Sequence, residues 1–199
     1  MHPPLAELHT AQDQAILQFR AWAAKQVPCL DTETTGMEGQ VWQLALVEQD
    51  TLTPRLHFTC QPEGEWSPKA AEMRDAHGAD LSQCPPASAF TAQLPQGQQF
   101  LTWNAPFDLG AIARTWPDWQ VRGECAMAAY APLAERWSES LGLWKYVSLG
   151  EACAAEQVDV SHLAAAHNAY GDACRLALLV QAVARRETHA ERAARETAP

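Results

Sequence analysis

The feature that most constrains this chain is an apolar segment that leads directly into two carboxylates. Residues 27–33 begin with apolar side chains and end at Asp31 and Glu33, and Gly36 and Gly39 follow. This pattern predicts a buried strand over 27–33 and a turn after it. Residues two apart on a strand face the same side, so Asp31 and Glu33 project together. Such a pair suits hard metals like Mg²⁺ or Mn²⁺. The alternative is a pair of solvated acids at a strand end.

The rest of the chain predicts a meandering sheet followed by helices, which is an α/β domain. Thr10 and Asp13 resemble a capping box that opens a first helix ending near Lys25. Further strands are expected over 41–47, 56–60, 99–103 and 122–127, and helices over 105–116, 128–135, 148–156 and 170–186. We therefore expect residues 1–26 to pack as a helix on a domain of residues 27–186. The tail, 187–199, is expected to be a frayed helical extension.

A second pattern lies where a predicted strand meets a predicted helix, over residues 103–108. Asn104 suits a helix N-cap, and Pro106 is tolerated in the first helical turn. An acid in the first turn, here Asp108, is favourable to the helix dipole. A purely structural interpretation is therefore available, and the functional one makes Asp108 a further active-site carboxylate.

A third pattern opens the last long helix, where His167 is followed five residues later by Asp172. The structural interpretation is a histidine bonded to backbone before the helix and a favourable acid in its first turn. The functional interpretation is a base next to a metal-binding carboxylate.

Taken together, the order, separations and flanking residues of the three patterns resemble the DEDDh branch of the DnaQ-like 3′–5′ exonucleases. Residues 29–36 are similar to that family's first motif, 104–108 to the second and 167–172 to the third. The resemblance covers residues 27–186, and the loop at 74–78 also looks familial. It implies a ribonuclease H-like α/β fold with a central mixed five-stranded sheet flanked by helices.

The resemblance also implies roles. Two divalent metal ions, Mg²⁺ or Mn²⁺, are expected at Asp31, Glu33, Asp108 and Asp172, with Asp31, Glu33 and Asp172 holding the metal beside the attacking water. His167 is the expected general base. The residues expected to line the substrate site are Thr34, Thr35, Gly36, Met37, Trp103, Asn104 and Phe107.

Three positions qualify the resemblance. The related tyrosine branch would place its tyrosine where this chain has Asn168, so the histidine branch matches better. The second motif usually begins with His, and here it begins with Trp103. The second strand commonly carries Glu where this chain has Gln43, so recognition of the terminal sugar is expected to differ.

The net charge of −10 argues against a protein that grips long duplexes, because such proteins neutralise many phosphates with a basic face. We therefore expect single-stranded or frayed 3′ ends of DNA as substrate and 5′-mononucleotides as product. An exoribonuclease or oligoribonuclease, a proofreading subunit with a DNA replication or repair partner, and a non-catalytic binding module stay open as alternatives. The sequence leaves the oligomeric state open.

Other patterns exclude further classes. The chain has no His-Glu-x-x-His motif, so a zinc protease of that type is disfavoured. The six cysteines form no C-x-x-C pair, so we expect reduced thiols. There is no signal-peptide pattern and no apolar run of the ~18 residues that a membrane span needs. We expect a cytoplasmic protein that does not enter a membrane.

Overall fold

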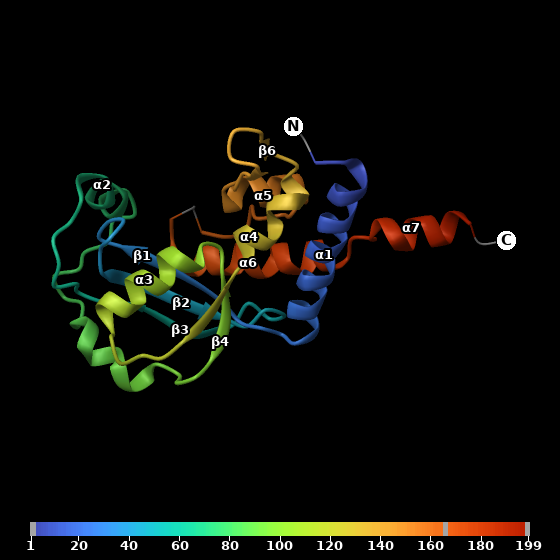
Figure 1. Ribbon diagram of the computed structural model, residues 1–199. Helices are drawn as coiled ribbons and strands as arrows, with labels where there is room; N and C mark the ends of the chain where they lie inside the picture. Colours follow the sequence, from blue (N-terminus) through green and yellow to red (C-terminus); the bar gives the residue numbers. More distant parts are fainter. Residues whose placement is uncertain (1–2, 165–166, 198–199) are drawn as a thin grey trace.

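A mixed five-stranded sheet forms the centre of the molecule (Figure 1). The computed structural model describes residues 3–164 and 167–197. The strands are β1 (Cys29–Thr34), β2 (Val41–Val47), β3 (Pro54–Thr59), β4 (Gln99–Thr102) and β5 (Arg122–Cys125), in the spatial order β3-β2-β1-β4-β5. Strand β2 is antiparallel to β1 and β3, whereas β4 is parallel to β1 and β5. The predicted five-stranded mixed sheet is therefore confirmed.

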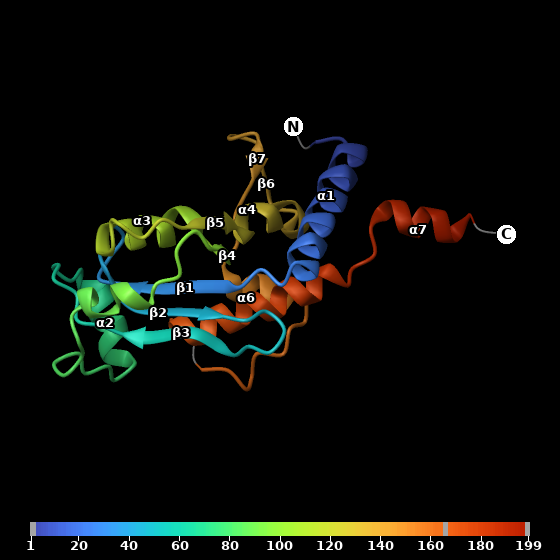
Figure 2. The ribbon, with the colours of Figure 1, turned by 90° about the horizontal axis from the view of Figure 1, so that it is seen from below.

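Helices cover the two faces of this sheet (Figure 2). The helices are α1 (Leu5–Ala24), α2 (Pro68–Ala76), η1 (Ala87–Gln93), α3 (Ala105–Thr115), α4 (Ala126–Tyr130), η2 (Ala131–Ala134), α5 (Leu149–Ala155), α6 (Ala169–Ala184) and α7 (His189–Glu196), and a small hairpin pairs β6 (Trp137–Ser138) with β7 (Leu143–Trp144). One buried cluster joins α1, α4, α5 and α6 to one face of the sheet, and a second joins α3 to the other face. No helix within the described residues has the length and hydropathy needed to cross a membrane.

Alternation along β1 decides which face receives the acids. Cys29 belongs to the cluster with α6, whereas Leu30 belongs to the cluster with α3. Since the side-chain period of a strand is two, Asp31 and Glu33 point to the α6 side, together with Cys29. Helix α6 therefore packs on the face of the sheet from which Asp31 and Glu33 project.

The N-terminal helix begins at Leu5, five residues before the predicted cap, so the prediction of a capping box at Thr10 is wrong. The Thr10 hydroxyl instead donates to the carbonyl of Ala6 within the helix, at 2.8 Å. Asp13 serves a different helix: its carboxylate accepts the backbone N–H groups of His189 and Ala190, at 2.7 and 3.2 Å. A side chain that stabilises a distant helix terminus leaves no signature in the local sequence.

The tail is helical as predicted, but α7 is a separate helix and not an extension of α6. Its own capping box pairs Thr188 with Glu191. Arg20 of α1 forms an ion pair with Glu191 at 2.6 Å, which adds to the contact of Asp13. The start of α7 is therefore attached to α1 by polar contacts, although no residue of α7 within the described part is buried.

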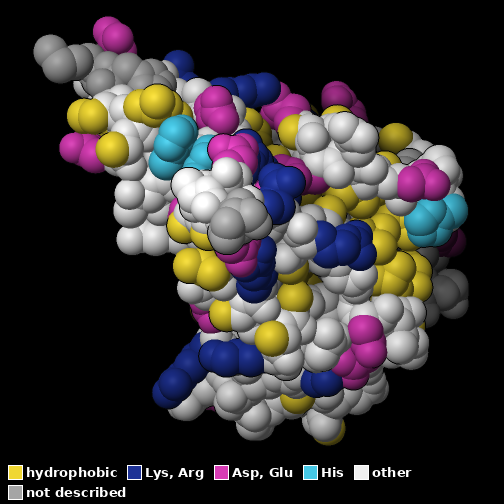
Figure 3. Space-filling model, turned by 90° about the vertical axis from the view of Figure 1, so that its right-hand side faces the viewer, with side chains coloured by type: hydrophobic (Ala, Val, Ile, Leu, Met, Phe, Trp, Pro, Cys, Tyr) yellow, Lys and Arg dark blue, Asp and Glu magenta, His cyan; other side chains and the backbone are white. Residues whose placement is uncertain are grey.

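The surface on the side of α1 and α7 carries basic and acidic side chains in mixture (Figure 3). No continuous basic stripe crosses the described residues of that face. On this face, the mixture of charges offers no extended basic surface to a duplex backbone.

Candidate active site

A cavity of about 380 Å³ collects side chains from β1 and the loop after it, from α2, from the start of α3 and from the start of α6. Most of the residues predicted from the three sequence patterns line it: Asp31, Glu33, Thr34, Gly36, Met37, Trp103, Asn104, Phe107, Asp108, His167 and Asp172. The structure thus brings together segments that lie about sixty residues or more apart in the sequence.

Thr35 is the predicted site residue that does not line the cavity. It is buried, its N–H donates to the carbonyl of Gln40 at 2.9 Å, and its hydroxyl accepts from the Gln40 N–H at 3.1 Å. Its carbonyl accepts the N–H of Ser67 at 2.8 Å. Thr35 shapes the loop after β1 and attaches the start of α2 to it, and its contact with substrate stays a prediction.

Two polar residues fix the elements that carry the acids. The Thr32 hydroxyl, on β1, donates to the Asp108 carboxylate at 2.7 Å, which holds the first turn of α3 against the strand. The Gln43 side-chain oxygen, on β2, accepts the N–H of Ala169 at 2.9 Å, which holds the start of α6. Gln43 lies directly opposite Glu33 in the sheet. The residue that departs from the family pattern therefore has a structural role here.

Crowding of the carboxylates perturbs their protonation. Burial is the largest cause that raises the pKa of Glu33, to about 8, and the charges of Asp172 and Asp108 add to it. Burial likewise raises the pKa of Asp108 to about 6, against the lowering effect of the Thr32 hydrogen bond. Burial and the neighbouring acids also raise the pKa of Asp31 well above its usual range.

Burial and neighbouring acids disfavour the charged forms of Asp31 and Glu33, and a bound cation offsets both effects. A ring nitrogen of His167 and carboxylate oxygens of Glu33 and Asp172 all lie within 4.8 Å of one another. Oxygen donors with this spacing fit hard divalent cations such as Mg²⁺ or Mn²⁺. The same spacing allows His167 to act either as a ligand or as a base beside the metal.

The Asp172 carboxylate has two partners that orient it. The backbone N–H of His167 donates to one oxygen at 2.8 Å, and Arg175 forms an ion pair with the other at 2.8 Å. Arg175 also donates to the carbonyl of Ala164, in the segment that leads to His167. Arg175 thus connects the acid on α6 with Ala164, three residues before His167.

His167 itself adopts a left-handed backbone conformation, with φ 63°. This region is uncommon for residues other than glycine, and residues held there cluster at functional sites. The side chain is exposed at the cavity.

The sequence patterns missed several contributors. Arg175 was missed because it lies on an otherwise apolar helix, although a buried arginine three residues after an acid is a readable ion-pair signal. The sequence patterns also identified no site residue on the α2 side of the cavity, which is lined by Ser67, Lys69, Ala70 and Met73. Trp42, on β2, is buried and also lines the cavity.

Solved structures share this fold. Exonuclease X in complex with 5′ overhanging duplex DNA is 21% identical, with a TM-score of 0.59 over 78% of this chain and 90% of that one. Pop2p of S. pombe, in a form with Mg²⁺ and Mn²⁺ bound, is 13% identical, with a TM-score of 0.57 over 92% of each chain. The likeness confirms the predicted ribonuclease H-like fold. No protein-family model and no curated protein sequence matches the chain.

The ring of Trp103 lines the cavity, and its N–H donates to the carbonyl of Val147 at 3.2 Å. With that donor engaged, Trp103 offers the cavity an apolar surface. Phe107 and the highly exposed Met37 also line it. The cavity therefore combines a cluster of acids with apolar surface of the kind on which bases and sugars pack.

Proposed function

We propose that this protein is a metal-dependent 3′–5′ exonuclease that hydrolyses phosphodiester bonds at single-stranded or frayed 3′ ends of DNA and releases 5′-mononucleotides. The observation that carries the proposal is the convergence of Asp31, Glu33, Asp108 and Asp172 with His167 on one cavity. These are the positions that the DEDDh pattern assigns to catalysis. The DNA in the Exonuclease X structure and the metals in the Pop2p structure support a nucleic-acid substrate and divalent cations.

Asp31, Glu33 and Asp172 would hold one cation, and Asp31 would share a second, with Asp108 supporting the site. Two such cations, when bound, supply an activated water, a stabilised pentavalent phosphate and a neutralised leaving oxygen. The burial and mutual repulsion of the acids favour cation binding over four free carboxylates.

Side chains of the protein supply the proton acceptor, the orientation of Asp172 and the contacts with substrate. His167 accepts the proton of the attacking water, because an imidazole can take up a proton near neutral pH and this one is exposed at the cavity. The N–H of His167 and the guanidinium of Arg175 keep the Asp172 carboxylate in place. Trp103, Phe107 and Met37 form the surface for the terminal sugar and base.

The proposal is tested by digesting four labelled substrates side by side: single-stranded DNA, blunt duplex, 5′ overhanging duplex and RNA. Each is incubated with Mg²⁺, with Mn²⁺ and with EDTA. We expect stepwise release of 5′-mononucleotides from the 3′ end of single-stranded DNA, and no reaction in EDTA. The Asp31→Asn variant, purified in the same way, controls for contaminating nucleases.

The other outcomes identify the alternatives. Faster digestion of RNA would assign an exoribonuclease or oligoribonuclease with the same chemistry. Internal cuts, or cleavage that EDTA does not stop, would overturn the proposal. Binding without any cleavage would leave a nucleic-acid-binding module on this fold.

A further inference from the structure

Among the described residues, a single basic side chain lines the cavity, and it belongs to Lys69 in the first turn of α2. The other charged groups there are the four carboxylates, with His167 beside them. The whole chain contains three lysines and has a net charge of −10. A polyanionic strand entering this cavity therefore meets one fixed positive charge.

The position of Lys69 is set by the loop that follows β1. The N–H of Ser67 donates to the carbonyl of Thr35 at 2.8 Å, and the Ser67 hydroxyl accepts the N–H of Ala70 at 3.3 Å to cap the helix. The backbones approach closely here, since a Cβ atom at Gly36 would lie 3.2 Å from the Ser67 Cβ. The start of α2 is thus attached directly to the loop after Asp31 and Glu33.

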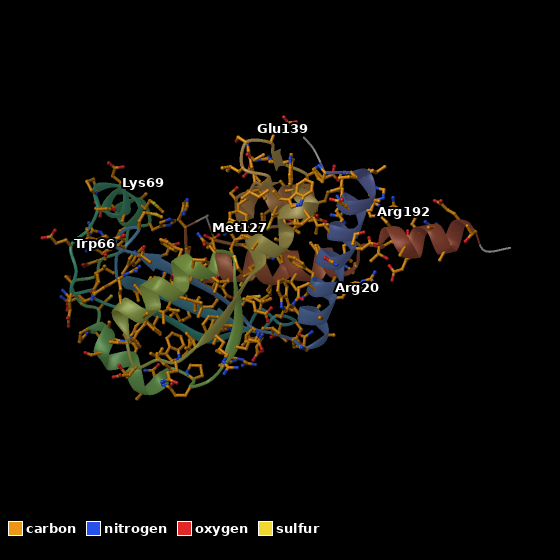
Figure 4. The ribbon with its side chains drawn as sticks, in the orientation of Figure 1. Arg20, Trp66, Lys69, Met127, Glu139 and Arg192 are labelled. Carbon is orange, nitrogen blue, oxygen red and sulfur yellow. The ribbon has the colours of Figure 1, made fainter. Side chains whose placement is uncertain are left out.

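Lys69 is also available to a ligand. Its side chain is exposed, and it has no ion-pair partner within the described residues. The other cation of α2 is engaged: Arg74 pairs with Asp75 at 2.6 Å and lies 4.6 Å from the ring centroid of Trp66. Figure 4 shows Lys69 on α2 at the opposite end of the molecule from Arg20 and Arg192.

We propose that Lys69 binds a backbone phosphate within the last few linkages of the single strand, and so holds the strand at the cavity. This inference rests on the proposed function. An ammonium group is a compact point charge that suits a phosphate without requiring one fixed geometry. A phosphate contact that does not depend on the base serves an enzyme that removes nucleotides of any sequence.

The test compares Lys69→Met and Lys69→Arg with the wild type on a 3′-labelled single-stranded oligonucleotide in Mg²⁺. We expect Lys69→Met to raise KM roughly 5- to 30-fold, the size of one charge-assisted contact, while kcat changes less than about twofold. Lys69→Arg keeps the charge and should retain most of the affinity. The melting temperature should stay unchanged, because no residue of the fully described helix α2 is buried.

Salt dependence separates a phosphate contact from a general loss of charge. For single strands, the slope of log affinity against log salt falls by about 0.7 for each phosphate contact removed. Lys69→Met should lower the slope by that amount. Lys25→Met is the matched control, because it removes one exposed charge at the end of α1 that does not line the cavity. Equal slopes for Lys69→Met and the wild type, or an equal drop in Lys25→Met, would overturn the proposal.

A set of oligonucleotides with one neutral methylphosphonate at each of the last few linkages locates the contact. The effect of Lys69→Met on KM should vanish for the oligonucleotide whose neutral linkage lies at Lys69, and persist for the others. Persistence at every linkage would contradict a phosphate contact.

Binding measured by fluorescence anisotropy with Ca²⁺ in place of Mg²⁺ keeps the two proposals distinguishable. If the wild type cuts nothing, the proposed function fails while the Lys69 dependence of binding is still tested. If the wild type cuts and Lys69→Met behaves like it, only this inference fails.

Discussion

The floor of the cavity and its α2 wall are built in opposite ways. The floor consists of β1 and α6, most of whose residues are buried, and hydrogen bonds from Thr32 and to Gln43 fix the neighbouring helices. None of the nine residues of α2, all of them described, is buried. Its start is attached through Ser67 to the loop after β1.

This difference indicates which side chains of the cavity must be positioned precisely. Carboxylates that share a cation must be held within fractions of an ångström, and rigid buried elements achieve this. A wall that meets strands of any sequence needs less precision and benefits from mobility, as binding elements of low local stability do. We therefore expect substitutions in the floor to change catalysis or stability strongly, and substitutions in α2 to change substrate use alone.

The largest effect is expected from Asp31→Asn. Asn is nearly isosteric but neutral, so the site loses the charge that both cations would share, and activity should fall by at least ~10⁴-fold. In EDTA the melting temperature should stay equal or rise, because one repelling carboxylate is gone. Asp118→Asn, an exposed acid after α3, should change neither quantity. An active Asp31→Asn enzyme would contradict the assignment of the floor.

His167→Ala tests the part of the floor that is exposed. Loss of a general base should lower kcat by ~10²–10⁴-fold. The Mg²⁺ concentration that gives half-maximal activity should shift only a few-fold. His162→Ala, an exposed histidine that does not line the cavity, is the matched control. A loss of metal affinity equal to the loss of rate would show that His167 is a ligand, which its distance to Glu33 and Asp172 allows.

A pH titration of stability in EDTA tests the repulsion within the floor. Burial and neighbouring acids raise the pKa of Glu33 from 4.5 to about 8, so the folded protein binds more protons than the unfolded chain between these values. Its contribution to stability is therefore fully present below pH 4.5 and is lost as the pH rises through about 8. We expect the free energy of unfolding to fall by roughly a few kcal/mol over this range.

Mg²⁺ should remove most of that pH dependence, because the cation stabilises the charged acids. Glu33→Gln is the matched variant, since it keeps the shape of the side chain and cannot titrate. It should flatten the curve in EDTA. A wild-type stability that rises with pH in EDTA would contradict the raised pKa of Glu33.

The floor could be predicted from the sequence because its signals are local. Asp31 and Glu33 follow an apolar strand, β2 was predicted with its observed bounds, and α3 and α6 show helical periodicity ending within two residues of the observed ends. These elements are specified by side-chain period and by residues at their termini. The convergence of the acids followed only from the family resemblance, since no local pattern encodes a contact across sixty or more residues.

The α2 wall, the β6–β7 hairpin and the attachment of α7 could not be predicted in the same way. Helix α2 has no buried residue, so it has no apolar periodicity to detect. The hairpin of β6 and β7 has strands of two residues, shorter than any pattern can resolve. Helix α7 has a local capping box at Thr188 and Glu191, but its attachment to α1 depends on Asp13, a residue more than 170 positions away. Where tertiary contacts replace local pattern, the sequence offers no comparable signal.

The smallest effect is expected from Met73→Ala in α2. Met73 lines the cavity from an element without buried residues, so its truncation should change the free energy of unfolding by less than ~0.5 kcal/mol. The lost apolar contact should raise KM only a few-fold, about 1 kcal/mol or less of binding. Leu176→Ala, in the buried core of α6, is the comparison, and should cost ~2–5 kcal/mol of stability. The two variants remove side chains of similar size from α2 and from the buried core of α6, so their contrast measures how differently the two elements are packed. Similar losses of stability in chemical denaturation would show that α2 is as firmly packed as the floor, and the division between a rigid catalytic floor and an adaptable wall would have to be abandoned.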